Sequence, residues 1–214
     1  MIKKQQISSE TIKRLAVYLR YLEKLYREGV KIISSSHISK ILNIPSSQFR
    51  KDLSFFGEFG KRGVGYDIGK LIREIKKIIG IDEKIRVIII GVGRLGSALI
   101  GYPGFSDLNI EISGAFDKSP EKVGKKIENI IIRNISGIGE FIKKEKIKVA
   151  VICVPANQAQ NVCDILVENS IKGILNFAPV KLLANENISI SNVDVASEIC
   201  NLIYLLKNSY AKSQ

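Results

Sequence analysis

The sequence predicts an α/β protein in which a helical N-terminal domain precedes a doubly wound parallel sheet. Three observations favour this class. Residues 1–82 follow helical hydrophobic spacing with short polar turns, residues 83–195 alternate apolar strand-like runs with helices, and an apolar helix is expected near the C-terminus. The predicted organisation is therefore a domain over 1–82, a sheet domain over 83–195 and a C-terminal helical segment over 196–214.

Composition excludes several classes of protein. With 45% hydrophobic and 25% charged residues, the 214-residue chain is neither disordered, collagen-like nor a coiled coil. Its longest uncharged stretch, residues 149–163, falls short of a membrane span, and the opening MIKKQQISSE is too polar for a signal peptide. Three cysteines without CxxC spacing indicate neither a disulfide framework nor a zinc site. We expect a cytoplasmic protein with reduced thiols, no bound metal and no membrane contact.

Positive charge is concentrated at the N-terminal end of the chain. The formal net charge is +12. Residues 1–82 hold 17 Lys and Arg against 8 Asp and Glu, whereas residues 83–214 hold 16 against 13. A basic domain on a nearly neutral body indicates a module that binds a polyanion such as nucleic acid, although a basic solvated surface has the same composition.

The N-terminal domain is predicted to contain a helix-turn-helix. A first helix is expected from Ser9, as its cap, to about Arg27, and a second helix follows Ser36. After a short turn, Ser46 is expected to cap a third helix that ends near Phe56. Two helices joined by so short a turn have the form of a DNA-binding motif.

The third helix has an apolar face and a polar face. At about 100° per residue, Phe49, Leu53 and Phe56 share the side expected to enter the core. The other side carries cations and hydroxyls suited to guanine edges and phosphates. We predict that this helix contacts DNA through Ser46, Ser47, Gln48, Arg50, Lys51 and Ser54. An ordinary exposed helix would share this pattern.

A glycine-rich segment, residues 57–66, follows the third helix. Its basic pair Lys61 and Arg62 lies between apolar or aromatic flanks, which predicts a β-hairpin with a basic tip. Such a hairpin would act as the wing of a winged helix and lie against the DNA. A fourth amphipathic helix is expected over 68–79, ending at Gly80.

The sheet domain opens with a dinucleotide-binding fingerprint. The apolar strand 86–90 leads into GxGxxG and then into a helix. The first glycine permits the tight turn, the second lets a pyrophosphate approach the backbone, and the third lets helix and strand pack closely. Free N–H groups at the helix start would bind the phosphates. The predicted phosphate loop is Gly91, Val92, Gly93, Arg94, Leu95 and Gly96.

The end of the next strand strengthens this interpretation. Strand 110–116 ends in Asp117, which lies 21 residues after Gly96 and can accept both ribose hydroxyls of the adenosine half. A carboxylate there repels a 2′-phosphate and favours NAD over NADP, although the adjacent Lys118 weakens that exclusion. An Asp that merely caps the following turn is the competing interpretation.

Two later strands end in loops that belong near the nicotinamide half of the cofactor, because ligands of open α/β sheets bind at the carboxyl ends of strands. These strands are expected over 149–154 and 173–177. They bring Val154, Pro155, Ala156, Asn176 and Phe177 into the predicted cofactor site.

The sequence offers no obvious catalytic group for hydride transfer. The single histidine, His37, lies in the predicted helix-turn-helix, and neither paired carboxylates nor zinc ligands are recognisable. We therefore expect NADH and NAD⁺ to act as effectors rather than redox reactants. Two alternatives stay open: an NAD-dependent oxidoreductase with a basic accessory domain, and a DNA-binding protein whose sheet domain is structural or binds another nucleotide such as CoA.

Several longer motifs resemble the Rex family, bacterial repressors that sense redox state. They are RKDLSFFGEFGKRGVGY at 50–66, GVGRLGSAL at 91–99, YPGF at 102–105, PEKVG at 120–124 and GILNFAP at 173–179. The resemblance covers nearly the whole chain, and its longest string is far more specific than GxGxxG.

The resemblance implies a homodimer whose winged helices read the halves of an AT-rich inverted repeat in double-stranded DNA. It implies that NADH releases the repressor and that the C-terminal helices are exchanged between subunits. It also implies that Arg20 pairs with Asp194 of the partner as a switch and that Tyr102 lies near the nicotinamide. Val195 stands where some relatives carry a larger apolar residue.

Overall fold

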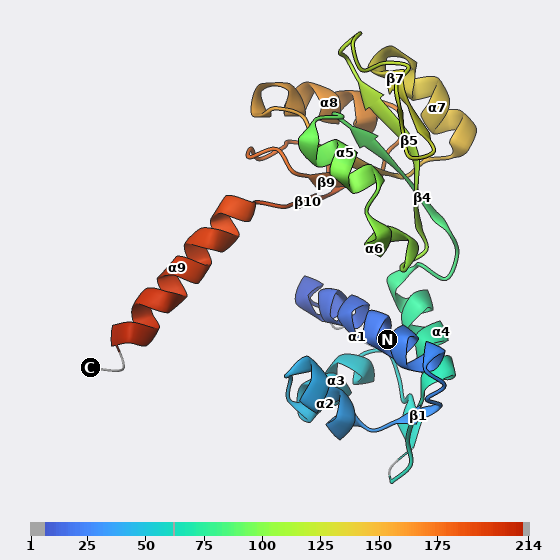
Figure 1. Cartoon of the computed structure of the whole chain (residues 1–214), viewed down its shortest axis with the longest axis vertical. Coiled ribbons are helices and arrows are strands. Elements are labelled where there is room, and N and C mark those ends of the chain that lie inside the picture. The colour runs from blue at the N-terminus through green and yellow to red at the C-terminus, as the bar shows by residue number, and fades with distance from the viewer. Residues whose placement is uncertain (1–6, 62, 212–214) are drawn as a thin grey trace. The chain divides into compact units, whose positions relative to one another are not determined.

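The chain folds into two units, seen in a computed structural model that describes residues 7–61 and 63–211 (Figure 1). The first unit holds the described residues up to Ile85 together with Ser106–Asn109. The second holds Arg86–Phe105 and the described residues from Ile110 onward. The short segment 106–109, which lies beyond the expected boundary at residue 82, is tied to the first unit by Asn109, whose side-chain amide donates to the Ile81 carbonyl at 2.8 Å.

The first unit is a winged helix. Its described elements are α1 (Ser9–Arg27), β1 (Ile32–Ile33), α2 (Ser35–Leu42), α3 (Ser46–Ser54), β2 (Gly60–Lys61), β3 (Gly65–Asp67) and α4 (Ile68–Ile79). The predicted hairpin is present, because β2 and β3 pair antiparallel with Gly60 opposite Tyr66. Strand β1 pairs with the other edge of β3 and was not predicted, since two residues show no hydrophobic period.

Three predicted helix starts differ from the structure. Ser8, one residue before the expected cap, accepts the Thr11 N–H and begins α1. Helix α2 is capped by Ser34, so it starts before Ser36. At α3 the cap position belongs to Pro45, whose ring has no acceptor, and Ser46 is already the first helical residue. Sequence alone does not choose among adjacent serines, because each offers the same hydroxyl.

The core of the winged helix joins α1, α3 and α4. Helix α1 packs along α4, and the buried ring of Phe49 on α3 lies edge to face against Tyr18 and Tyr66, with centroids 5.0 and 5.3 Å away. Phe49 and Leu53 are buried as predicted. Phe56 was wrongly assigned to the helix, because α3 ends at Ser54 and Phe56 is only half-buried beyond it.

The second unit is a Rossmann-like α/β domain. Its described elements are β4 (Ile85–Ile90), α5 (Arg94–Ile100), α6 (Pro103–Ser106), β5 (Ile110–Asp117), β6 (Lys126–Ile127), β7 (Ile130–Asn134), η1 (Ile135–Gly137), α7 (Ile138–Glu145), β8 (Val149–Ile152), α8 (Ala156–Glu168), β9 (Gly173–Asn176), β10 (Ser189–Asn192) and α9 (Val195–Ala211). The sheet order is β10-β9-β8-β4-β5-β7-β6. Strand β4 lies at the centre, and the chain order reverses between β4 and β8, where ligands of such sheets bind.

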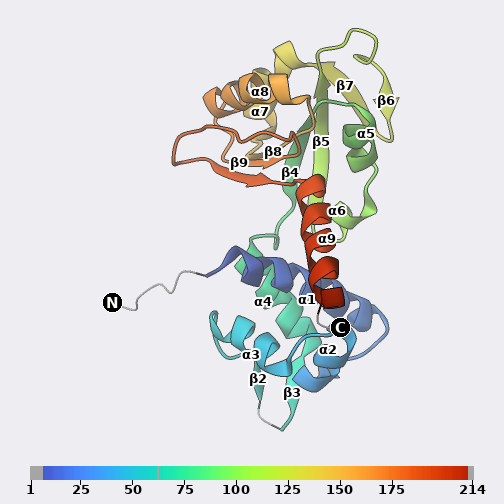
Figure 2. The same cartoon turned by 90° about the vertical axis from the view of Figure 1, so that its left-hand side faces the viewer.

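Helices cover both faces of this sheet (Figure 2). Ile88 and Ile90 of β4 point to the face where α7 and α8 pack, in a core that also holds Phe116 and Leu166. Ile89 points the other way, toward Gly96 of α5. Because successive side chains of a strand alternate in direction, the run Ile88–Ile90 supplies apolar surface to both layers.

Helix α9 differs from the other helices because its side chains are exposed. Every described side chain from Val195 to Asn208 is exposed in the single chain. Asp194 precedes the helix, and its carboxylate accepts the Ser197 N–H at 3.1 Å. Within the described part of the chain, no helix combines the length and apolar character needed to cross a bilayer.

Candidate functional site

The loop between β4 and α5 combines two crowded glycines with an open one. A Cβ on Gly96 would overlap the Gly91 carbonyl oxygen, and one on Gly91, whose φ is +93°, would lie 2.7 Å from the Cys153 carbonyl group. Beside Gly93 no atom lies within 4 Å of the corresponding position. The loop therefore packs tightly against the sheet while Gly93 leaves its backbone accessible, as a phosphate-binding turn requires.

A cavity of about 840 Å³ adjoins this loop at the carboxyl ends of β4, β5 and β8. Its size and place fit a dinucleotide. The predicted cofactor residues that line it are Gly91, Gly93, Arg94, Leu95, Asp117, Lys118, Val154 and Pro155. Val92, Gly96 and Ala156 belong to the same loops but are outside this wall. Val92 instead donates its N–H to Asp117.

Asp117 is the buried acid of this cavity, at 7% exposure. Its Oδ1 accepts the Ser119 N–H at 2.9 Å, and its Oδ2 accepts the Val92 N–H at 2.8 Å and the Lys122 ammonium at 2.9 Å. Burial alone would raise the pKa of Asp117, but these three donors outweigh burial and hold the pKa below its usual value. Asp117 is therefore an anion at neutral pH.

Three further predicted cofactor residues, Tyr102, Asn176 and Phe177, also lie outside the cavity wall. The Asn176 amide is buried and donates to the carbonyls of Ala178 and Val180 and to the Asn192 side chain, so it shapes the loop after β9. Phe177 is half-buried in that loop. Tyr102 is exposed and packs edge to face on Phe105, with ring centroids 5.2 Å apart. Their contact with a cofactor stays a prediction.

The sequence interpretation missed several residues of the cavity. Lys122 reaches Asp117, and the polar side chains Asn157, Gln158 and Asn161 enter the wall from α8. The α8 residues could have been found, because they follow the carboxyl end of a buried strand. Cys153 also lines the cavity, and burial raises its pKa to about 11, which keeps the thiol neutral.

The outward face of α3 carries the residues expected to bind DNA. Ser47, Arg50, Lys51 and Ser54 are exposed, and Ser46 and Gln48 are half-buried. Arg50 donates from Nη1 to the Ser35 hydroxyl at the start of α2, at 3.0 Å. A cavity of about 580 Å³ brings Arg50 together with Lys61 of the hairpin and with Ser34 and Ser35. Arg62 lies outside the described residues.

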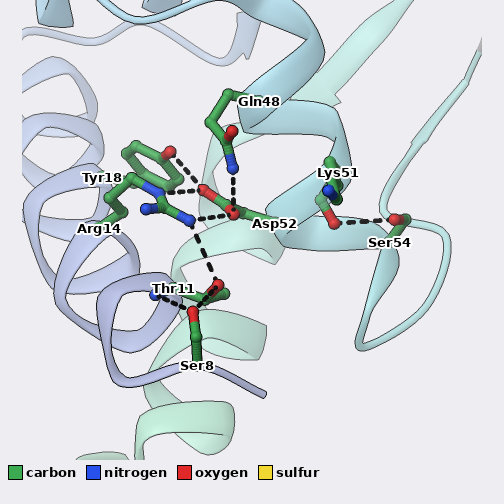
Figure 3. A network of polar contacts seen from close by, with 8 residues as sticks. All are labelled: Ser8, Thr11, Arg14, Tyr18, Gln48, Lys51, Asp52 and Ser54. Carbon is green, nitrogen blue, oxygen red and sulfur yellow. Dashed lines mark hydrogen bonds and ion pairs between the residues drawn. The ribbon is translucent and has the colours of Figure 1, made fainter. Parts of the chain in front are cut away.

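The inner side of α3 is fixed by a buried carboxylate (Figure 3). Asp52 is fully buried and accepts from Arg14 Nε and Nη2, at 2.7 Å each, and from the Tyr18 hydroxyl at 2.7 Å. Gln48 Nε2 adds a fourth hydrogen bond at 2.8 Å. Four donors match the acceptor capacity of a carboxylate. Asp52 therefore faces α1.

This network determines charge and orientation at the helix. Burial alone would raise the pKa of Asp52, but the hydrogen bonds from Arg14, Tyr18 and Gln48 outweigh burial and hold the pKa below its usual value. Burial and the bond to Asp52 raise the pKa of Tyr18. The hydrogen bond from Gln48 Nε2 holds this side chain against Asp52 on the inner side of α3.

The two residues of the implied switch lie in different units. Arg20 is exposed on α1, and Asp194 is exposed where it caps α9. Their pairing across subunits stays a prediction.

Comparison with known proteins covers both units. A family profile described as "Putative DNA-binding protein N-terminus" matches residues 6–54, and one described as "CoA binding domain" matches residues 82–180. The redox-sensing transcriptional repressor Rex of Clostridium acetobutylicum is 41% identical over 207 residues, which are 97% of each chain.

Solved structures agree with this. RSP, a Rex-family repressor, in complex with β-NAD⁺ and operator DNA superposes with a TM-score of 0.88 at 34% identity, covering 98% of this chain and 96% of that one. RSP in complex with β-NADH superposes with a TM-score of 0.84 at 33% identity, covering 98% of this chain and 100% of that one. Because these similarities extend over nearly the whole length of both chains, the chain belongs to the Rex family of redox-sensing transcriptional repressors.

Proposed function

We propose that this chain is a repressor that binds an AT-rich inverted-repeat operator as a homodimer and releases it when NADH occupies the cavity beside Gly93. NADH and NAD⁺ act as effectors and are not consumed. The observation that carries the proposal is the presence, in one chain, of a dinucleotide-type cavity with Asp117 at its edge and a winged helix with Arg50 and Lys51 outward. A protein of this kind would work in the cytoplasm.

Relatives support both halves of the proposal. RSP has been crystallised with β-NAD⁺ and operator DNA together and with β-NADH. In this chain, the four hydrogen bonds to Asp52 would hold α3 in the pose that presents Arg50 and Lys51. Arg50 would contact a guanine edge or a phosphate, and Lys51 and Lys61 would contact phosphates.

Selectivity for the reduced cofactor would follow from charge. In the loop after β8, where the nicotinamide half is expected, the cavity wall carries the apolar side chains of Val154 and Pro155. An oxidised nicotinamide is a cation and a reduced one is neutral, and an unpaired cation is costly to bury. An apolar wall beside the ring would therefore favour NADH over NAD⁺.

The coupling between the two sites is reciprocal. A ligand shifts the equilibrium between two dimer conformations only as far as its affinities for the two conformations differ. A nearly complete shift requires an affinity ratio of about 10⁴ between them. By linkage, operator DNA must weaken NADH binding by the factor by which NADH weakens operator binding.

Fluorescence titration of NADH, with and without an AT-rich inverted-repeat duplex selected by the wild-type chain, tests the proposal. We expect weaker NADH binding in the presence of the duplex, and identical affinities would refute the switch. Arg50→Ala is the control, since it should lose about 1–3 kcal/mol of operator binding and keep the NADH affinity of the free protein.

CoA is a second candidate effector, because the profile that matches residues 82–180 is described as a CoA binding domain. The Asp117 carboxylate argues against it, since an acid at the ribose position repels a ribose phosphate. The same titration with CoA as competitor distinguishes the two: displacement of NADH by micromolar CoA would favour CoA.

A further inference from the structure

The hydrogen-bonding capacity of Asp117 is nearly filled by protein donors. A carboxylate offers about four acceptor positions, two on each oxygen. On Oδ2 both are taken, by the Val92 N–H at 2.8 Å and the Lys122 ammonium at 2.9 Å. On Oδ1 the Ser119 N–H takes one, at 2.9 Å. A ribose whose two hydroxyls are to donate hydrogen bonds to both oxygens of Asp117 can therefore bind only if one of the donors on Oδ2 leaves.

Of the two donors on Oδ2, Lys122 is the one that can move. The Val92 N–H belongs to the buried backbone of the glycine loop, between Gly91 and Gly93. The Lys122 ammonium is carried on a flexible side chain that is 40% exposed. Once released, it stays near the carboxylate, because its backbone is held in a turn by the bond from its N–H to the Ser119 carbonyl at 3.0 Å.

The charge of Lys122 then affects which ribose the site accepts. An acid at this position excludes a 2′-phosphate by repulsion. Lys122 offsets that repulsion directly, and Lys118 in the same wall adds a second, exposed cation. A free ammonium beside Asp117 can form a charge-assisted hydrogen bond to a phosphate, whereas a 2′-hydroxyl gains much less from it.

We propose that Lys122 is a specificity-determining residue of the cavity. It releases Asp117 Oδ2 to the ribose and, by remaining beside the carboxylate, limits discrimination between a ribose 2′-hydroxyl and a 2′-phosphate. The inference rests on the proposed function, because it assumes that the cavity binds NADH through Asp117.

The test compares NADH with NADPH, which share every group except the 2′-phosphate. Dissociation constants for both are measured by nicotinamide fluorescence on the full-length wild type and on Lys122→Met, which keeps the length of the side chain and removes its charge. We expect the ratio of the NADPH constant to the NADH constant to rise about tenfold in Lys122→Met, the effect of one charge-assisted hydrogen bond. Lys122→Arg should stay within about threefold of the wild-type ratio, because the cation is kept.

Lys126→Met is the matched control. It removes the same charge from exposed strand β6, outside the cavity wall, and should leave the ratio unchanged. A role of Lys122 in folding alone would weaken both nucleotides together and leave their ratio unchanged, which would overturn the inference. If the wild type binds neither nucleotide, the proposed function fails as well. If it binds NADH normally and the ratio is unaffected by Lys122→Met, only the present inference fails.

Discussion

Arg14 on α1 holds both carboxylate oxygens of Asp52 on α3, through Nε and Nη2 at 2.7 Å each. The pair joins residues 38 positions apart and fixes the distance and rotation between the two helices. A fork of two parallel hydrogen bonds sets orientation as well as strength. Helix α3 is therefore tied from its buried side, while Arg50 and Lys51 on its outer side are exposed.

Substituting Asp52→Asn should destabilise the protein and weaken operator binding. The variant leaves the Arg14 guanidinium without its anion, and breaking a buried ion pair in this way costs about 3 kcal/mol. Because Arg14 is 31% exposed, water offsets part of the loss and the decrease should not exceed that value. Urea unfolding measures it, and Asp82→Asn, at an exposed position, is the control. A free energy of unfolding equal to that of the control would contradict the assigned role.

The same pair predicts a dependence of stability on pH. The folded pKa of Asp52 lies below its unfolded value, so the pair's contribution is fully present above the unfolded pKa, at about 4, and is lost as pH falls through the folded pKa. The difference in unfolding free energy between wild type and Asp52→Asn should therefore be constant from about pH 8 to 5 and should shrink below about pH 4. Urea titrations of both proteins across this range measure it. A difference that grew on acidification would show the opposite shift.

Local patterns in the sequence predicted the parts of the fold that depend on local chemistry. The GxGxxG turn, the acid at Asp117 and the wing hairpin were all placed from spacing alone, and each has the predicted backbone. The hairpin β6–β7 and helix α7 were not predicted, although β7 contains an uninterrupted apolar run and Ile138, Phe141 and Ile142 of α7 keep helical spacing.

Contacts between distant segments could not be predicted in this way. Nothing in one sequence shows that Arg14 and Tyr18 lie opposite Asp52. Lys122 was likewise missed, since its role depends on how the turn after β5 folds back on Asp117.

The two glycines of the phosphate loop should respond differently to alanine. At Gly93 the φ is −84° and the space is open, so Gly93→Ala should fold normally and lose NADH affinity, because the methyl group occupies the approach to the backbone. At Gly96 the methyl group would overlap the Gly91 carbonyl oxygen, so Gly96→Ala should lower thermal stability even without ligand. Calorimetric melting and NADH titration separate the two effects. Equal loss of stability in both variants would refute the assignment.

The exposed apolar side chains of helix α9 predict a surface that is buried against a second copy of the chain. Its large apolar side chains, Val195, Ile199, Leu202, Ile203, Tyr204, Leu205 and Leu206, are 50–64% exposed. At about 100° per residue, Val195, Ile199, Leu202 and Leu206 share one side of the helix. An apolar stripe on a helix is normally buried, and the proposed homodimer would cover this one with a second copy of this chain.

The wild type is expected to sediment as a dimer, and Leu202→Glu should shift it toward monomer in sedimentation velocity at micromolar concentration, because the dimer would have to bury an unpaired carboxylate. Asn208→Glu, which adds the same charge at an exposed polar position of α9, should remain dimeric. Operator binding should fall steeply in Leu202→Glu alone, since a monomer contacts one half-site and loses the gain from two linked contacts. A wild type that sediments as a monomer would lack the two-fold symmetry that matches the two halves of an inverted repeat, and this result would refute the proposed homodimer.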